Sequence, residues 1–594
     1  MNSLSVGGKS WILKNYNQAY LSFIKENFSL DEITSKLLSI RNIKKDEINS
    51  FLNPSIKNFL PNPNNLIDME KSTLRTVQAI YKNEKIGIFG DYDVDGATST
   101  ALLGNYFTEL NLNYEIYIPD RKKEGYGPSV KSFKKLIEKK VKIIFTVDCG
   151  TLSFEAINFA KENKIDVIVL DHHQSEIKLP KAFSVINPNR LDDKSNLQYL
   201  CAAGVTFMFL VSVNRALRSE NWFNPKNINE PNLIDYLDLV SLGTVCDVVP
   251  LVGLNRAIVK QGLKIIKLKK NLGLKTLFDI CKIESSPSIY HLGYLLGPRI
   301  NAGGRVGKCS HGANLLLNKD PKNSFQLASE LDQYNKERKL LEKDLLQKIL
   351  DQIKVNSDDP VLILSGTNWH EGIIGIVAAR LKDKFNKPVI IISLDGNIGK
   401  ASARSIIGFD IGAVIIAAAQ NNILLKGGGH KMAGGFSIKV ENIEKLRDFI
   451  FRKFRDINID LTADRPLLVD SIISASAINL DFYNKVAILS PFGSGNPEPK
   501  FIVEDVKTIN GKIVGEKHIK SVLIGNDGST IKCIAFNALE NDIGAYLLKK
   551  NNKSFNIAGK LSLNEWKGES NVEFIIDDIS VNKTFKNTVP SSIG

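Results

Sequence analysis

The sequence predicts a mixed α/β protein, in which two α/β lobes joined by a long helix are followed by a small β-barrel of OB type. Three observations predict this class. Short apolar runs alternate with helical stretches from Lys85 onward, residues 324–353 contain no Gly or Pro, and the chain after about Thr462 holds short β-rich runs between turns. A length of 594 residues allows several domains, each with its own core.

Four β-branched, apolar runs predict the strands of the first lobe. They lie at 85–90, 113–119, 141–147 and 164–170. Strands of a parallel sheet are buried on both faces and therefore read as continuous apolar segments. We assign this lobe to residues 81–255, and we expect residues 1–80 to pack on the core as an N-terminal segment.

A helical connector and a second α/β unit follow the first lobe. We assign the connector to residues 256–355, because its stretch 324–353 carries apolar residues at helical spacing among charges. The second unit, 356–458, begins with the apolar runs 361–365 and 388–393 on either side of a helical stretch. The long helix is therefore expected to join two lobes.

The C-terminal region, 459–594, is expected to be a β-domain. Its five short strands are KFIVEDV, IKSVLIG, TIKCIAF, SFNIAGKLS and VEFIIDD. Five such strands predict a barrel of OB type, a fold that often binds single-stranded nucleic acids, although a β-sandwich would have a similar pattern.

Composition favours a protein of the cytoplasm with a polyanionic partner. Lys and Arg number 78 against 64 Asp and Glu, a net charge of +14, although the codon bias of an AT-rich genome is an equal explanation for the excess. No apolar run approaches the roughly 18 residues of a membrane span, so no membrane partner is expected. The six cysteines form no CxxC pair and predict buried thiols.

Acidic residues follow three of the predicted strands directly. GDYDVDG (90–96) follows the first strand, VDCG (147–150) includes the end of the third, and DHH (171–173) follows the fourth; VCDVVPL (245–251) adds a further aspartate. The carboxyl ends of parallel strands meet at one edge of a sheet, so these groups should converge. Each alone could be a solvated loop, but together several carboxylates and a histidine can hold two divalent metal ions that activate water.

In this order, the four segments resemble the acidic motifs of the DHH phosphoesterase superfamily. The resemblance implies a two-lobed, metal-dependent phosphodiesterase with two Mn²⁺ or Mg²⁺ ions. The resemblance places His173 beside the scissile phosphate. Asp91 lies one step outside the usual Asp-x-Asp pair, so we expect it to assist catalysis by supporting the metal ligands without binding the metal itself. The metal ligands that the resemblance implies are Asp93, Asp95, Asp148, His172 and Asp247.

The second lobe resembles the domain associated with DHH enzymes, through WHEGIIGIVAARL (369–381), SARS (402–405) and GGGHKMAGGF (427–436). A run of glycines lets backbone amides approach an anion, and flanking basic side chains add donors. A flexible turn is the alternative for GGG. The candidate phosphate-binding residues of this lobe are His370, Ser402, Arg404, Gly428, Gly429, His430 and Lys431.

The connector segment LGPRINAGGRVG (296–307) narrows the resemblance to the RecJ family of single-strand-specific DNA exonucleases, together with FLNPSIKNFLPNPNNLIDMEK (51–71) and SPFGSGNPEPKF (490–501). The resemblance implies that Arg299, Asn301 and Arg305 face the substrate, with both arginines holding phosphates by bidentate contacts; a plain surface loop is the alternative.

The expected function is 5′-to-3′ hydrolysis of single-stranded DNA to mononucleotides in DNA repair and recombination. A single-strand-binding protein and a RecQ-like helicase are the expected protein partners. Two alternatives are a phosphodiesterase for short oligoribonucleotides or cyclic dinucleotides, and a non-catalytic replication scaffold. The complete ligand set argues against the scaffold.

Overall fold

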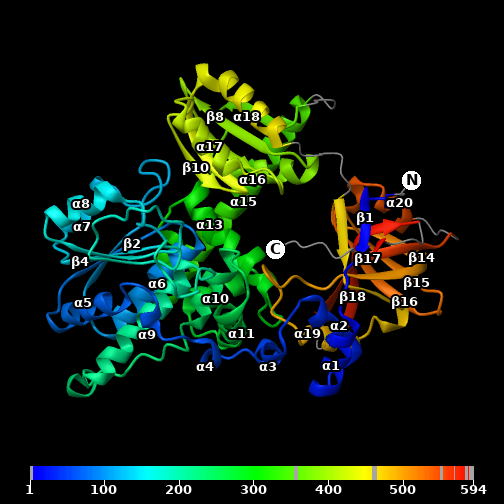
Figure 1. Ribbon diagram of the computed structural model, residues 1–594, viewed down its shortest axis with the longest axis horizontal. Coiled ribbons are helices and arrows are strands. Elements are labelled where there is room, and N and C mark those ends of the chain that lie inside the picture. Colours follow the sequence, from blue (N-terminus) through cyan, green and yellow to red (C-terminus); the bar gives the residue numbers. More distant parts are fainter. Residues whose placement is uncertain are drawn as a thin grey trace. The chain divides into compact units, whose positions relative to one another are not determined.

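The computed structural model describes residues 4–353, 359–457, 465–548, 553–566, 569–581 and 586–587. The chain forms two compact units (Figure 1). The larger unit comprises Pro61–Asp247 and Gly262–Thr462, and the smaller comprises Met1–Leu60, Val248–Gln261 and Ala463–Gly594. Residues 1–80, which the sequence predicts to pack on the core as one segment, are divided at Leu60 between the two units. The domain boundaries expected near 355 and 458 lie outside the described residues.

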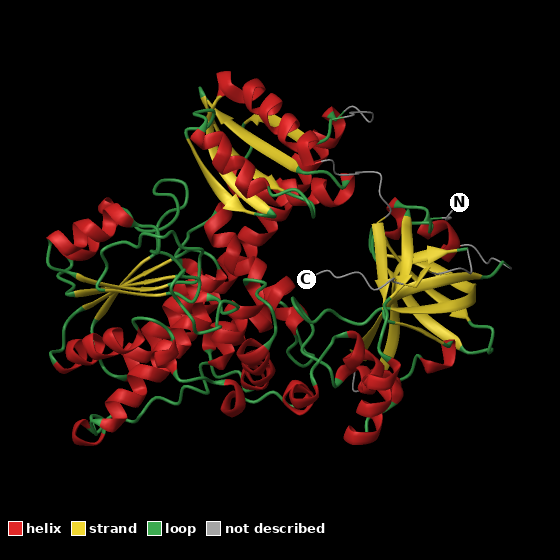
Figure 2. Cartoon of the chain, in the orientation of Figure 1, coloured by secondary structure: helices red, strands yellow, loops and turns green. Residues whose placement is uncertain are grey.

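A five-stranded parallel sheet forms the first lobe of the larger unit, in the order β3-β2-β4-β5-β6. Every residue of β2 and β4 is buried, which explains their unbroken apolar sequences. Helices cover both faces, with α7 and α8 on one side and α5, α6 and α9 on the other (Figure 2). The bounds are β2 Ile86–Gly90, β3 Tyr114–Tyr117, β4 Ile143–Val147, β5 Asp166–Leu170, β6 Ser184–Ile186, α5 Met69–Tyr81, α6 Val94–Glu109, α7 Val130–Glu138, α8 Phe154–Glu162 and α9 Ala202–Ser219.

The connector is helical, and its last helix is the expected long one. α15 runs over 32 residues, Pro321–Gln352. It begins three residues before the predicted stretch, because Asp320 caps it and Pro321 suits the first helical position. α10 Leu237–Cys246 precedes the connector. The other helices of the connector are α11 Gly253–Lys267, α12 Leu272–Ile280, η4 His291–Leu296, α13 Gly297–Val306 and α14 His311–Leu317.

The second lobe of the larger unit is a mixed five-stranded sheet, in the order β10-β11-β9-β8-β7. The GGGH segment is not a turn but lies in the edge strand β10, which pairs with β11. The strands are β7 Leu362–Thr367, β8 Val389–Asp395, β9 Ile398–Arg404, β10 Lys426–His430 and β11 Ala433–Lys439, and the helices are α16 Glu371–Phe385, α17 Ile411–Gln420 and α18 Ile443–Ile457.

The smaller unit is built on a closed barrel, which confirms the OB-like prediction over the sandwich. The five predicted strands are β14, β15, β16, β17 and β18, and pairing of β14 with β17 closes the ring. N-terminal helices α1 and α2 contribute Ile24, Leu37 and Leu38 to the core that fills the barrel. The bounds are β14 Phe501–Val514, β15 His518–Ile524, β16 Thr530–Ala535, β17 Phe555–Trp566, β18 Glu569–Ser580, α1 Gln18–Phe28 and α2 Glu32–Ile40.

Short elements complete the smaller unit. β13 Ser471–Ile473 extends the barrel sheet beside β14, and β1 Lys9–Leu13 lies between β12 Arg465–Val469 and β19 Lys586–Asn587 in a parallel three-stranded sheet. Its remaining helices are α3 Ile48–Leu52, α4 Ile56–Phe59, α19 Leu480–Ala487 and α20 Ile543–Leu548. Of the helices that the structure describes, none has both the length and the apolar character that a membrane crossing requires.

Candidate metal centre

The first three candidate carboxylates lie between the end of strand β2 and the first turn of helix α6. Asp93 is the N-cap of α6 and accepts a hydrogen bond from the Gly96 amide at 2.9 Å. Asp95 is buried in the first turn, where it accepts from two backbone amides at the start of α9 at 2.6 and 2.9 Å. Asp91 is also buried, and its Oδ1 has no hydrogen-bond partner among the described residues. An orphaned buried carboxylate oxygen is costly, and a cation would satisfy it.

Strands β4 and β5 deliver the next residues. Asp148 follows β4 with φ of 59°, a left-handed conformation that aspartate tolerates. Asp171 follows β5 and fixes the two histidines after it. Its Oδ1 accepts from the backbone amides of His172 at 2.8 Å and His173 at 3.2 Å, and it bonds His173 Nδ1 at 2.8 Å. Asp171 therefore orients the histidines rather than facing a ligand.

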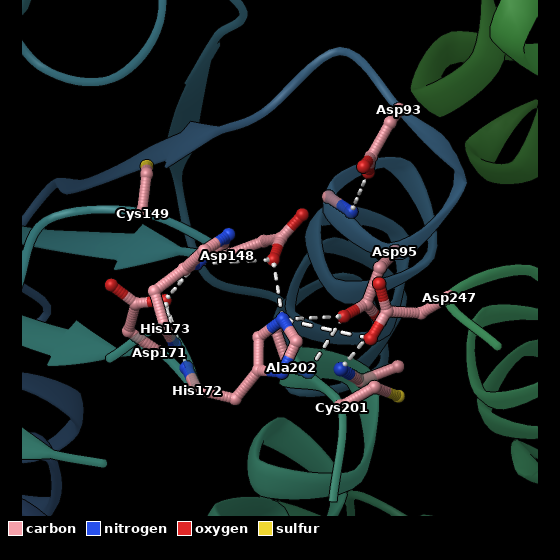
Figure 3. A network of polar contacts seen from close by, with 12 residues as sticks. Asp93, Asp95, Asp148, Cys149, Asp171, His172, His173, Cys201, Ala202 and Asp247 are labelled. Atoms are coloured by element: carbon pink, nitrogen blue, oxygen red, sulfur yellow. Dashed lines mark hydrogen bonds and ion pairs between the residues drawn. The ribbon is translucent and has the colours of Figure 1, made fainter. Parts of the chain in front are cut away.

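His172 lies at the centre of the cluster (Figure 3). Its Nε2 lies 3.3 Å from an oxygen of Asp148, 3.7 Å from Asp95 and 3.7 Å from Asp247. Asp247 caps the end of α10, so the fourth acidic motif reaches the site from a helix and not from a strand. Side chains almost 160 positions apart in the chain thus meet at the carboxyl edge of the first sheet.

Three groups of side chains in this cluster have spacing that suits a metal ion, with their ligand atoms within 4.8 Å of one another. One is Asp91, Asp93 and Asp148, the second is Asp95, His172 and Asp247, and the third is Asp148, His172 and His173. Because Asp148 and His172 each belong to two groups, the groups overlap, as expected for adjacent ions that share ligands. Asp91 belongs to the first group, although the sequence analysis places it behind the ligands.

Burial and mutual repulsion dominate the electrostatics of the cluster. Burial and the charge of Asp93 raise the pKa of Asp148 well above its usual range. Burial, with Asp95 and Asp93, raises the pKa of Asp247 to about 8. Without a cation Asp247 therefore holds its proton near neutral pH, and a divalent ion would displace that proton. Burial lowers the pKa of His173, but the bond to Asp171 outweighs it and raises that pKa to about 9.

Three residues that position the cluster are not among the predicted site residues. Asn187 and Asn189 follow β6, and their amides donate to the backbone carbonyls of His173 at 2.8 Å and His172 at 2.5 Å. The Tyr126 hydroxyl donates to the carbonyl of Asp148 at 2.9 Å and lies 3.3 Å from the His173 ring nitrogens. The asparagines do carry a sequence signal, since both closely follow a strand of the sheet. Tyr126, in a loop, carries none.

The candidate arginines of the connector have different surroundings. Arg305 is held by the Gly372 carbonyl at 3.2 Å, and burial and the nearby charges of Arg121, Arg338 and Arg404 lower its pKa to about 10. Such a concentration of guanidinium groups suits a phosphate. Arg299 is instead paired with Asp332 of α15 at 2.8 Å and donates to the Leu295 carbonyl. Arg121, which the sequence analysis did not single out, also lies over the Tyr92 ring.

The second lobe presents its candidate residues on three elements. His370 caps α16 and accepts from the Gly372 amide at 3.1 Å. Ser402 and Arg404 lie on β9 and are joined by a 3.3 Å hydrogen bond. The other candidates of this lobe lie at or next to the exposed edge strand β10: Gly428, Gly429, His430 and Lys431. Asn301, a candidate of the connector, is half-buried on α13. Arg404 and Arg305 lie close enough to repel each other, so this lobe extends the arginine group.

Comparisons with known proteins match all three expected parts of the chain. The DHH family N-terminal domain matches residues 85–244, the DHHA1 domain matches 358–456 and the RecJ OB domain matches 469–578. The chain is similar to the single-stranded-DNA-specific exonuclease RecJ of Haemophilus influenzae, with 34% identity over 89% of this chain and 93% of that protein.

A second relative and a solved structure agree with this match. The single-stranded-DNA-specific exonuclease RecJ of Bacillus subtilis is 30% identical over 96% of this chain and 71% of its own length. The crystal structure of RecJ from Thermus thermophilus in complex with Mn²⁺ has a TM-score of 0.81 and 25% identity, and the match covers 98% of this chain and 81% of that one. The similarity extends over the catalytic lobe, the associated lobe and the barrel, so the chain belongs to the RecJ family.

Proposed function

We propose that this protein is a metal-dependent exonuclease that hydrolyses single-stranded DNA. The observation that carries the proposal is the convergence of Asp91, Asp93, Asp95, Asp148, His172 and Asp247 at one edge of the sheet. The relatives named single-stranded-DNA-specific exonucleases support the substrate. A scaffold would have no use for a cluster of buried carboxylates that repel one another.

The donor set fits Mn²⁺ or Mg²⁺. Asp91, Asp93 and Asp148 would hold one ion, and Asp95, His172 and Asp247 the other; carboxylates suit both metals, and a single imidazole is better suited to Mn²⁺. When bound, two such ions lower the pKa of a water and clamp a phosphate in line with it. The unpartnered Oδ1 of Asp91 supports a direct bond from this residue.

The chain's own residues orient the reaction. Asp171 holds the His173 ring through Nδ1, and Tyr126 contacts the same ring, so the imidazole has a fixed position beside Asp148. A fixed, protonated ring could donate to a phosphate oxygen at the cluster. Arg305 and Arg404, with His370, would hold neighbouring phosphates of the strand.

Direction, product and partners follow from the family resemblance. The proposal includes 5′-to-3′ polarity, release of mononucleotides in DNA repair and recombination, and a cytoplasmic location. A single-strand-binding protein and a RecQ-like helicase are the proposed protein partners. Short oligoribonucleotides and cyclic dinucleotides are the alternative substrates, but the barrel of the smaller unit favours a longer strand.

Digestion of DNA labelled at either end tests the proposal. Single strands should be degraded with Mn²⁺ or Mg²⁺, from the 5′ end only, while duplexes of the same sequence and single strands in chelator should stay intact. Asp247→Asn should be inactive, and Asp410→Asn, at an exposed helix cap in the second lobe, serves as a matched control. Equal cleavage of duplex, or preference for di- to pentanucleotides, would contradict the proposal.

A further inference from the structure

Two exposed tyrosines are stacked on the connector. Tyr290 is 59% exposed and Tyr294 is 71% exposed, and their ring centroids lie 5.5 Å apart with planes inclined by 21°. Large apolar rings are costly to leave in water. More than half of each of these two side chains is nevertheless open to the solvent.

The helix that carries this tyrosine pair runs beside the metal centre. Tyr290 precedes η4, which continues directly into α13. The Leu292 carbonyl accepts from Cys246 Sγ at 3.4 Å, next to Asp247. At the other end, a Cβ on Gly304 would lie 2.8 Å from the Tyr92 ring, between Asp91 and Asp93. One continuous helix thus packs on two of the acidic segments.

A local distortion of the helix coincides with the tyrosine pair. Residues His291–Leu296 form a π-helical turn, whereas the residues after it are α-helical. π-turns are rare and are frequent at functional sites, because they change which side chains share a face. Tyr290 and Tyr294 are four residues apart, and in a helix residues at this spacing lie on the same side. In this helix their two rings also lie nearly parallel.

We propose that Tyr290 and Tyr294 form a platform on which an unpaired base of the DNA substrate stacks, several nucleotides from the scissile phosphate. The inference rests on the proposed function. The helix fixes the distance between the platform and the metal centre, and Arg305 at the far end of the same helix would hold a phosphate of the same strand. A paired base inside a duplex has no free face, so the platform selects single strands.

Substitution of the two rings tests the platform. The double variant Tyr290→Ala/Tyr294→Ala should raise KM for a long single strand by roughly 5- to 150-fold, the equivalent of ~1–3 kcal/mol of base stacking, while kcat stays constant. The penalty should shrink as the strand is shortened. Tyr290→Phe/Tyr294→Phe should restore KM, because phenylalanine keeps the flat face. Phe325→Ala, at a 63% exposed ring on α15, is the matched control and should leave KM unchanged.

A second measurement locates the stacked base. In chelator, where hydrolysis is blocked, 2-aminopurine is placed at successive positions from the 5′ end of the strand. Its emission should change at one position or two adjacent positions on binding to the wild-type protein, and this change should disappear in the alanine variant. Unchanged KM together with a position-independent signal would overturn the platform and leave the pair as a contact for a protein partner. Failure of the proposed function is distinguishable, because wild-type protein would then not degrade the strand at all.

Discussion

Asp148 is placed where it can bind a metal ion but where its negative charge destabilises the folded protein. Its carboxyl is buried, repelled by Asp93 and Asp95, and shared by two of the three possible metal groups. In the absence of a cation its charged form destabilises the fold, whereas a bound ion would reverse that effect.

Asp148→Asn should therefore raise Tm in chelator and abolish hydrolysis, because the amide removes the repulsion but binds metal poorly. The rise in Tm that Mn²⁺ gives the wild-type protein should be much smaller in the variant. Thermal melts with and without Mn²⁺, beside a nuclease assay, measure all three effects. A variant that melts below wild type in chelator would show that the carboxylate stabilises the fold instead.

Asp238 provides a pH dependence away from the metal centre. Burial raises its pKa to about 7 at the start of α10. The folded protein retains this proton up to pH about 7, whereas the unfolded chain loses it near pH 4. The folded state binds more protons in that window, so this group makes stability fall as pH rises from about 4 to 7.

Asp238→Asn should remove that loss of stability. The variant should match wild type near pH 4 and exceed it at pH 8, by at most ~4 kcal/mol, since three pKa units set the upper limit. Melting temperatures across this pH range provide the measurement. A difference that does not vary with pH would mean that the carboxyl has the same pKa in both states.

Individual residues of the site were predictable to different degrees. The acidic motifs revealed themselves because each aspartate stands at the end of an apolar run. Asn187 and Asn189 also follow a strand, but the carbonyls to which they donate depend on the loops that the fold brings to them, and Tyr126 carries no such signal. The partner of Arg299 was equally hidden, since nothing in the sequence pairs α13 with Asp332 of α15.

At the scale of elements, α13 places its two arginines in different surroundings, which predict different roles. Arg299→Ala should lower Tm, because a largely buried charged hydrogen bond worth ~1–3 kcal/mol is lost, without changing the salt dependence of DNA binding.

Arg305→Ala should reduce the slope of log affinity against log salt by about one unit for any base sequence. Arg305→Lys should restore this only partly. Affinities for two unrelated strands at several salt concentrations, with melts, compare the variants; identical behaviour of both would refute the division.

The edge strand β10 was the least predictable element, because glycine favours turns over strands. Its pairing with β11 brings backbones so close that a Cβ at Gly429 would lie 2.5 Å from the Ala433 carbonyl, whereas Gly428 has open space around it. Gly429→Ala should therefore destabilise the second lobe by ~1–3 kcal/mol, and Gly428→Ala should cost less than about 1 kcal/mol. Thermal melts of the two variants provide the comparison, and similar losses would contradict the geometry.

At the scale of the whole molecule, the sequence predicted the parts and missed their grouping. Strand and helix patterns are local, so the two lobes, the long helix and the barrel could be recognised. The packing of residues 4–60 on the barrel depends on contacts more than 400 positions apart, such as those that Asp578 receives from Ser5, Gly7 and Trp11. No local pattern encodes such contacts.

Asp578→Ala should therefore loosen the N-terminal segment, because three donors lose one buried carboxylate. We expect protease cleavage within residues 1–60 at concentrations that leave the wild type intact, with no loss of metal-induced stabilisation in the larger unit. Limited proteolysis and mass spectrometry identify the cut. Cleavage distributed equally over both units would contradict the separate stability of the two.

The three-part composition of the smaller unit also matters while the chain is being made. Its first segment emerges from the ribosome long before residues 463–594, which complete its core. At 5–20 residues per second the wait until the last segment is complete is about 27–107 s. Throughout that interval Ile24, Leu37 and Leu38 have no barrel to enter. The nascent N-terminus is thus a target for chaperones and proteases, and synonymous codons that slow the last quarter of translation should lower the yield of intact protein.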